Sequence, residues 1–169
     1  MPSPLRAPPS IRWLTLAPTR RRVALPVRTL GVDFGERRIG LAISDDEGRL
    51  AVPLGTIHRT SDRAAIAELI RIGEREGAAA LVVGEPVHLD GSRGPAAERA
   101  RAFAERLARA SGWPCTLVNE SLTTVAAAER LREAGIDPRR EPERLDAVAA
   151  QILLQEALDT RLAQARSGS

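Results

Sequence analysis

The sequence predicts an α/β protein with one mixed five-stranded sheet and helices on both faces. Two observations predict it. Residues 28–58 contain three short apolar segments joined by tight turns, which is typical of antiparallel strands. After residue 60, stretches with helical periodicity alternate with short apolar runs, which indicates strands connected through helices. The chain has 169 residues, of which 43% are hydrophobic and 28% charged, so it can form a globular domain with a sizeable core.

The predicted strands of the first part cover 28–34, 38–44 and 50–58. The first turn lies at Gly35, and the second at the sequence Asp45-Asp46-Glu47-Gly48, whose residue types favour turns. Apolar and small residues alternate in the first two segments, as expected when one strand face meets a different layer from the other. These three strands form the antiparallel half of the predicted sheet.

The second part begins with a helix over 62–76, which Ser61 or Asp62 can cap and Gly77 can end. The remaining elements follow in order: a strand at 80–83, a Gly- and Pro-rich loop at 84–95, a helix at 95–110, a strand at 115–118, and helices at 124–134 and 142–164. Pro142 suits the first turn of the last helix. Continuous apolar runs predict that both strands are buried on two faces.

Residues 1–26 differ in composition from the rest. They are rich in Pro, contain five Arg and have no acidic residue, so we expect a disordered extension or a misread start preceding a domain at 27–169. Without those five Arg, 20 basic residues stand against 22 acidic ones. The basic isoelectric point therefore belongs to the extension and says nothing of nucleic-acid binding by the domain.

The sequence indicates neither a membrane-spanning protein nor one that uses a cysteine as a disulfide partner or nucleophile. No apolar run is long enough to cross a membrane. Cys115 is the only cysteine, which excludes an internal disulfide and suits a cytoplasmic protein; its apolar surroundings predict a buried side chain rather than a nucleophile.

Three acidic residues occupy unusual places. Asp33 interrupts an apolar strand, Glu120 follows the last strand, and Asp146 lies at the edge of the apolar stripe of the last helix. Each alone has an ordinary explanation, since Asp33 could bond the turn, Glu120 could be a loop residue and Asp146 suits the first turns of a helix. Gly31 shares a strand face with Asp33 and indicates close approach of a ligand or of another part of the backbone.

Together, the three carboxylates predict a metal site at the end of the sheet. Buried carboxylates repel one another unless cations neutralise them. Oxygen ligands without a Cys or His cluster favour Mg²⁺ or Mn²⁺. Two such ions are the usual apparatus for phosphodiester hydrolysis.

Four stretches, LGVDFGERRIGLAIS, VVGEPVHLDGS, VNESLTT and RLDAVAAQILL, carry a resemblance to the YqgF family, also called RuvX, of ribonuclease H-like nucleases. The resemblance covers about 28–160. It implies a ribonuclease H-like fold and a metal-dependent nuclease that either matures the 5′ end of 16S ribosomal RNA or resolves Holliday junctions. It also implies that the catalytic, metal-binding acids are Asp33, Glu120 and Asp146.

The resemblance implies substrate contacts as well. Arg37 and Arg38 match basic positions and are candidates for phosphate binding, although a solvated turn is the alternative. Thr123 and Thr124 fall in the matched VNESLTT stretch, and His88 either positions water or phosphate or is an ordinary loop residue. The chain departs from the family at Asn119 and Ser121, where the family usually has an acid and an Arg, and at Glu85, where it usually has Leu or a similar residue.

Two other classes compete with the nuclease. An actin- or hexokinase-like nucleotide binder also opens with a strand carrying Asp, but it needs two such domains. A nucleic-acid-binding protein without catalysis would explain the altered motif, but all three acids are present. For the nuclease we expect precursor ribosomal RNA as substrate, with structured DNA as the alternative, bound by a monomer or a homodimer. Few aromatic residues are available for stacking on bases, so backbone and shape recognition is expected.

Overall fold

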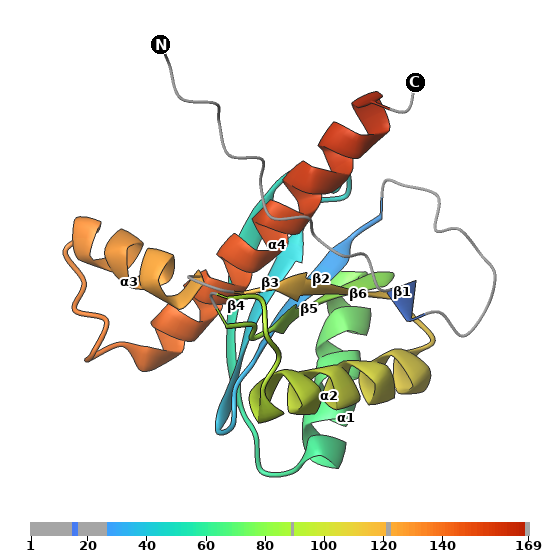
Figure 1. The fold of residues 1–169 in the computed structure, drawn as a ribbon, viewed down its shortest axis with the longest axis horizontal. Coiled ribbons are helices and arrows are strands. Elements are labelled where there is room, and N and C mark those ends of the chain that lie inside the picture. Colours follow the sequence, from blue (N-terminus) through green and yellow to red (C-terminus); the bar gives the residue numbers. More distant parts are fainter. Residues whose placement is uncertain (1–14, 17–26, 89, 121–122, 168–169) are drawn as a thin grey trace.

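A mixed β-sheet forms the centre of the protein (Figure 1). The computed structural model describes residues 15–16, 27–88, 90–120 and 123–167. The sheet order is β1-β6-β5-β2-β3-β4. The strands are β1 (Thr15–Leu16), β2 (Thr29–Phe34), β3 (Arg38–Ser44), β4 (Ala51–His58), β5 (Ala80–Glu85) and β6 (Cys115–Asn119).

The five predicted strands, the antiparallel arrangement of the first three and the mixed sheet are confirmed. β2, β3 and β4 are antiparallel neighbours, whereas β5 runs parallel to β2 and β6 parallel to β5. The sequence did not predict β1, two residues of the N-terminal extension that pair antiparallel with β6. The predicted disorder of the rest of 1–26 lies outside the described residues.

Helices cover both faces of the sheet, as predicted (Figure 1). They are α1 (Asp62–Glu76), α2 (Pro95–Ser111), α3 (Thr123–Glu133) and α4 (Pro142–Ser167). Their bounds agree with the predicted ranges to within three residues. α1 and α2 lie on one face, α4 on the other, and α3 packs against α4. Among the described helices, none combines the length and apolar character needed to span a membrane.

Local signals explain where α1 begins and ends. The Ser61 hydroxyl accepts a hydrogen bond from the Ala64 amide at 3.1 Å, which satisfies one of the free donors of the first turn. Gly77 ends the helix in the left-handed conformation, with φ 73°, which a residue with a side chain rarely adopts.

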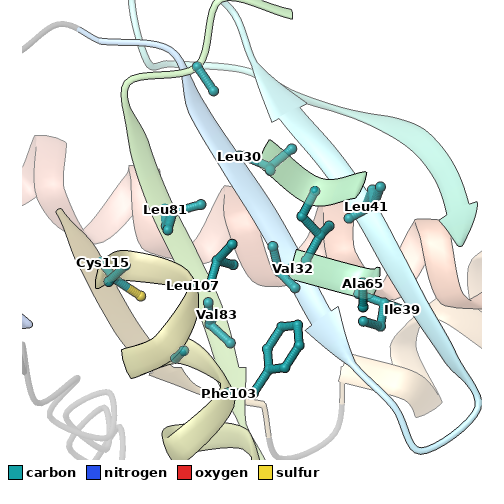
Figure 2. Packing of buried hydrophobic residues seen from close by; sticks show 14 of the residues in the cluster. Leu30, Val32, Ile39, Leu41, Ala65, Leu81, Val83, Phe103, Leu107 and Cys115 are labelled. Atoms are coloured by element: carbon teal, nitrogen blue, oxygen red, sulfur yellow. The ribbon is translucent and has the colours of Figure 1, made fainter. Parts of the chain in front are cut away.

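Alternate strand residues face different layers. Leu30, Val32 and Val83 point to the α1 and α2 side, where Phe103 and Leu107 of α2 complete a fully buried core (Figure 2). The α4 side has smaller strand residues, Ala42, Val82 and Val118, against Leu153 and Leu154. A Cβ at Gly31 would lie only 2.8 Å from the Cβ of Leu154. The glycine therefore lets α4 approach β2 closely.

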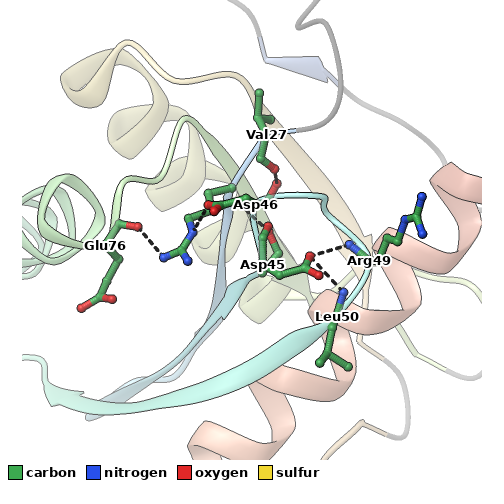
Figure 3. Close-up of polar contacts among 9 residues, drawn as sticks. Val27, Asp45, Asp46, Arg49, Leu50 and Glu76 are labelled. Carbon is green, nitrogen blue, oxygen red and sulfur yellow. Dashed lines mark hydrogen bonds and ion pairs between the residues drawn. The ribbon is translucent and has the colours of Figure 1, made fainter.

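The β3–β4 turn closes the sheet at the end where β2 begins (Figure 3). There Asp45 accepts hydrogen bonds from the amides of Arg49 and Leu50, at 2.7 and 3.2 Å. Nearby, Arg28 bonds the Asp46 carboxylate at 2.6 Å and the Glu76 carbonyl at 3.0 Å. These contacts stabilise one end of the sheet and leave the other end, where β2 and β5 finish, for the predicted acids.

Candidate active site

Asp33 and Glu120 meet although their strands are not neighbours. Asp33 lies near the end of β2, and Glu120 follows β6, with β5 between them in the sheet. The contact is possible because the intervening residue of β5 is Gly84. A Cβ at that position would collide with Glu120 Oε2. Because Gly84 has no side chain, the Glu120 carboxylate can lie over β5 and reach Asp33.

The two carboxyl groups lie close enough to shift each other's pKa. Burial raises the pKa of Asp33, and the charge of Asp146 adds to this rise, whereas a hydrogen bond with Glu120 opposes it. Burial, followed by the charge of Asp33 and the hydrogen bond with Asp33, raises the pKa of Glu120 to about 9. Because two carboxyl groups can hydrogen-bond to each other only when one of them is protonated, the pair retains a proton at a pH where isolated carboxyl groups have lost theirs.

Asp146 lies beside this pair on α4. The strand partner of Asp33 on β3 is Gly40, and a Cβ at Gly40 would collide with the backbone carbonyl of Asp146. Two further contacts hold the start of α4 against β4, because the Thr56 hydroxyl donates to the Glu143 carbonyl at 2.7 Å and His58 pairs with the Glu143 carboxylate at 3.0 Å.

The Asp146 carboxylate is already engaged by a cation. Arg38 donates from Nε to Asp146 Oδ2 at 2.6 Å, and the bond raises the pKa of Arg38. The predicted phosphate ligand Arg38 is therefore held on a predicted metal ligand, whereas Arg37 at the same turn is exposed.

The three acids gather in one region but do not converge on a point. Within the described part of the chain, no three His, Cys, Asp or Glu side chains lie close enough to hold a metal ion together. The chemistry of the site nevertheless fits a hard cation. Glu120 Oε2 is buried with no hydrogen-bond donor within reach, and the available ligands are all oxygens. The residues that could hold such an ion are Asp33, Glu120 and Asp146.

The structure places the Thr123 side chain inside the protein. Its hydroxyl donates to the Glu120 carbonyl at 3.0 Å, which ties the start of α3 to Glu120. Thr124 is exposed at the start of α3. His88 is exposed in the loop after β5, and its ring lies over Gly94 at the start of α2.

The departure at Glu85 has a structural explanation. The Glu85 side chain is buried and accepts a hydrogen bond from Arg93 Nε at 2.8 Å. This ion pair closes the loop between β5 and α2, where Val87 and Arg93 also form a β-bridge. Of the other two departures, Asn119 ends β6 and Ser121 lies outside the described residues.

The sequence reasoning missed the roles of Gly40 and Gly84. Both are strand glycines on the α4 side, where one accommodates the backbone of Asp146 and the other the carboxylate of Glu120. Glycine inside a strand marks a close approach, so the signal used for Gly31 applied to these positions as well.

Comparisons with known proteins show to which family the chain is similar. A family model described as "RuvX: Holliday junction resolvase" matches residues 27–160. A relative from Anaeromyxobacter sp. (strain Fw109-5) is 49% identical over 138 residues, covering 80% of this chain and 98% of the relative. One from Chloroflexus aurantiacus is 44% identical over 132 residues, covering 78% of this chain and 86% of the relative. Both are named "Putative pre-16S rRNA nuclease".

Among solved structures, Thermus thermophilus RuvC in complex with a Holliday junction substrate is similar with a TM-score of 0.52. The similarity covers 81% of this chain and 96% of that one at 18% identity, which shows the shared ribonuclease H-like fold.

Proposed function

The chain belongs to the RuvX family, and from this premise we propose that it is a metal-dependent endonuclease that matures the 5′ end of 16S ribosomal RNA. The observation that carries the proposal is the half-buried pair of Asp33 and Glu120, with Asp146 beside it. Three acids gathered in one partly buried place cost free energy, because they repel one another and lose water. A bound divalent cation would offset this cost, because it neutralises negative charge at the site.

The proposed ligands are Asp33, Glu120 and Asp146. Bound there, Mg²⁺ or Mn²⁺ would supply an activated water and stabilise the charge on the leaving oxygen. Glu120 has to lose its proton before it can act as a ligand, so metal binding releases a proton from this residue. Gly84 and Thr123 position Glu120, while Gly40 positions Asp146.

We propose that the substrate is held through its backbone. Of the described aromatic residues, Phe103 is buried in the core, and Phe34 and Trp113 are partly buried against it; Phe34 and Phe103 stack with ring centroids 4.4 Å apart. Their packing within the protein leaves little ring surface for stacking on bases. Arg37, exposed at the β2–β3 turn, is the proposed phosphate ligand, and the exposed residues Thr124 and His88 are proposed further contacts.

The names of the relatives and the description of the family model favour different substrates. The relatives named for precursor 16S ribosomal RNA match this chain at 44–49% identity over most of both sequences, and they support RNA and, with it, work in the cytoplasm. The description of the family model supports the second candidate, resolution of Holliday junctions. Resolution would require a symmetric dimer that places two sites on one junction.

The experiment offers both substrates to the wild-type chain. A precursor RNA fragment spanning the 5′ end of 16S ribosomal RNA and a four-way DNA junction are incubated with Mg²⁺, Mn²⁺ or EDTA. We expect RNA cleavage with either metal, none in EDTA, and none for Asp33→Asn with an unchanged circular dichroism spectrum. Asp46→Asn, which removes an exposed acid at the opposite end of the sheet, is the control and should cleave normally. Cleavage of the junction alone would mean that the substrate is DNA and not RNA. Cleavage of neither substrate would reject the proposed nuclease function.

A further inference from the structure

Arg38 and Asp146 come from elements far apart in the sequence, yet they form a close ion pair. They are 108 residues apart, and Arg38 Nε lies 2.6 Å from Asp146 Oδ2. The side chains are 35% and 22% exposed, so water shields the pair only in part. The bond commits one oxygen of the third predicted metal ligand to an internal cation.

This ion pair accounts for the incomplete convergence of the acids. Asp33 and Glu120 are in contact, whereas the carboxylate of Asp146 is held by Arg38 on the first residue of β3. The backbone of Asp146 is fixed by its packing on Gly40, so reorientation of the side chain is the means by which its carboxylate can change partner.

We propose that Arg38 is an internal counterion that competes with a divalent cation for Asp146 and, once displaced, turns to a substrate phosphate. The inference rests on the proposed nuclease function and adds an order of events to it. Without metal, the guanidinium offsets part of the negative charge of the site. A bound ion with two positive charges replaces that neutralisation and repels the guanidinium, because like charges at short range disfavour each other.

The released side chain has a suitable partner at hand. Arg38 is adjacent to Arg37 at the β2–β3 turn, and a guanidinium binds phosphate oxygens in a two-pronged geometry. Metal binding would therefore add a phosphate contact to the site. Arg38 acts in this scheme as a positioning residue for Asp146 before metal binding and as a substrate contact afterwards.

The test measures Mn²⁺ affinity directly by isothermal titration calorimetry. We expect Arg38→Gln to bind Mn²⁺ at least about fivefold more tightly than wild type, because loss of a partly exposed ion pair corresponds to roughly that factor. Arg38→Lys keeps the charge but not the planar donor and should lie between the two. Circular dichroism and thermal melting show whether each variant folds.

The matched control is Arg28→Gln. Arg28 pairs with Asp46, labelled in Figure 3, at the same distance of 2.6 Å, and its side chain is 34% exposed, but it lies at the other end of β2. The control removes one positive charge without touching the acids, so its Mn²⁺ affinity should stay within about twofold of wild type.

A second readout tests the release of Arg38. Binding of a fluorescent RNA fragment is measured in EDTA and in Ca²⁺, with the RNA checked for integrity on a gel. Arg38→Gln should weaken binding several-fold more in Ca²⁺ than in EDTA, whereas Arg28→Gln should have the same effect in both. Equal effects of Arg38→Gln in both conditions would overturn the release.

The outcomes separate the two proposals. Mn²⁺ binding by wild type with unchanged or weaker binding by Arg38→Gln would overturn the counterion and leave the nuclease intact. No Mn²⁺ binding by the folded wild-type chain would reject the proposed metal site and this inference with it. Tighter binding by Arg38→Gln than by either wild type or Arg28→Gln supports the competition.

Discussion

Replacing Glu120 with Gln should stabilise the metal-free protein while abolishing metal-dependent cleavage. Glu120 is half-buried beside Asp33, and its partial burial, together with the Asp33 carboxyl, raises its pKa to about 9. A Gln amide has nearly the same shape and can donate to Asp33 as the protonated carboxyl does. The variant gains this bond without having to take up a proton, and it loses a metal ligand.

The size and sign of the stability difference follow from the proton that Glu120 binds in the folded protein. Glutamate in an unfolded chain has the ordinary value of 4.5, so between that pH and about 9 the folded protein holds a proton that the unfolded chain has released. The free energy of unfolding therefore falls as pH rises through this range. By pH 7 the loss for wild type is about 3 kcal/mol, which Gln avoids. That corresponds to a rise of roughly 10 °C in Tm for the variant.

Thermal melting in EDTA at several pH values measures the difference. Glu120→Gln should exceed wild type clearly at pH 7 and 8 and approach it near pH 4.5. Glu129→Gln, on an exposed residue of α3, controls for the general effect of losing an acid and should follow wild type. With saturating Mn²⁺, wild type should gain Tm and the variant should not, because only wild type retains all three carboxylates.

Parallel melting curves for wild type and Glu120→Gln across this pH range would refute the reasoning. They would mean that Glu120 is ionised in the folded protein near neutral pH. A lower Tm of the variant at pH 8 in EDTA would refute it more strongly, since it would show that the charge itself stabilises the fold.

Three further predictions concern other residues. Gly84→Ala should keep the fold but reduce cleavage at least tenfold, because the new Cβ displaces the ends of the Glu120 and Leu153 side chains and no backbone; circular dichroism and single-turnover rates check this. Gly40→Ala should lower stability by about 1–3 kcal/mol in urea unfolding, because its Cβ meets the backbone carbonyl of Asp146, and an unchanged unfolding midpoint would contradict that packing. Cys115 should react with iodoacetamide only in denaturant, because burial raises the pKa of its thiol to about 12; mass spectrometry detects any modification of the native protein.

Much of the fold was predictable because its signals are local. The turn at Asp45–Gly48, the cap at Ser61 and the glycine at position 77 set the ends of elements through bonds within a few residues. Alternation in the strands placed Asp33 and Gly31 on the same strand face, and the structure shows that α4 packs against Gly31 on this face. The two-residue strand β1 had no comparable signal, because it exists only through pairing with β6.

The candidate site was predictable in its members and not in its contacts. Asp33 and Glu120 stood out because charged groups are rare beside buried strands. Their meeting depends on Gly84, a residue of a third strand, and the burial of Thr123 depends on the turn that α3 imposes. Such relations join residues through the packing of whole elements, which sequence spacing does not encode.

The sequence by itself determined the helices and strands after residue 27, their order and the positions of the three acids, because hydrophobic periodicity and turn chemistry act over a few residues at a time. The tertiary structure alone decided that Arg38 binds Asp146 and that Glu85 binds Arg93. Each of these pairs forms where the fold brings opposite charges together with limited access to water. The free energy of such a contact depends on distance and burial, and these exist only once the chain has folded.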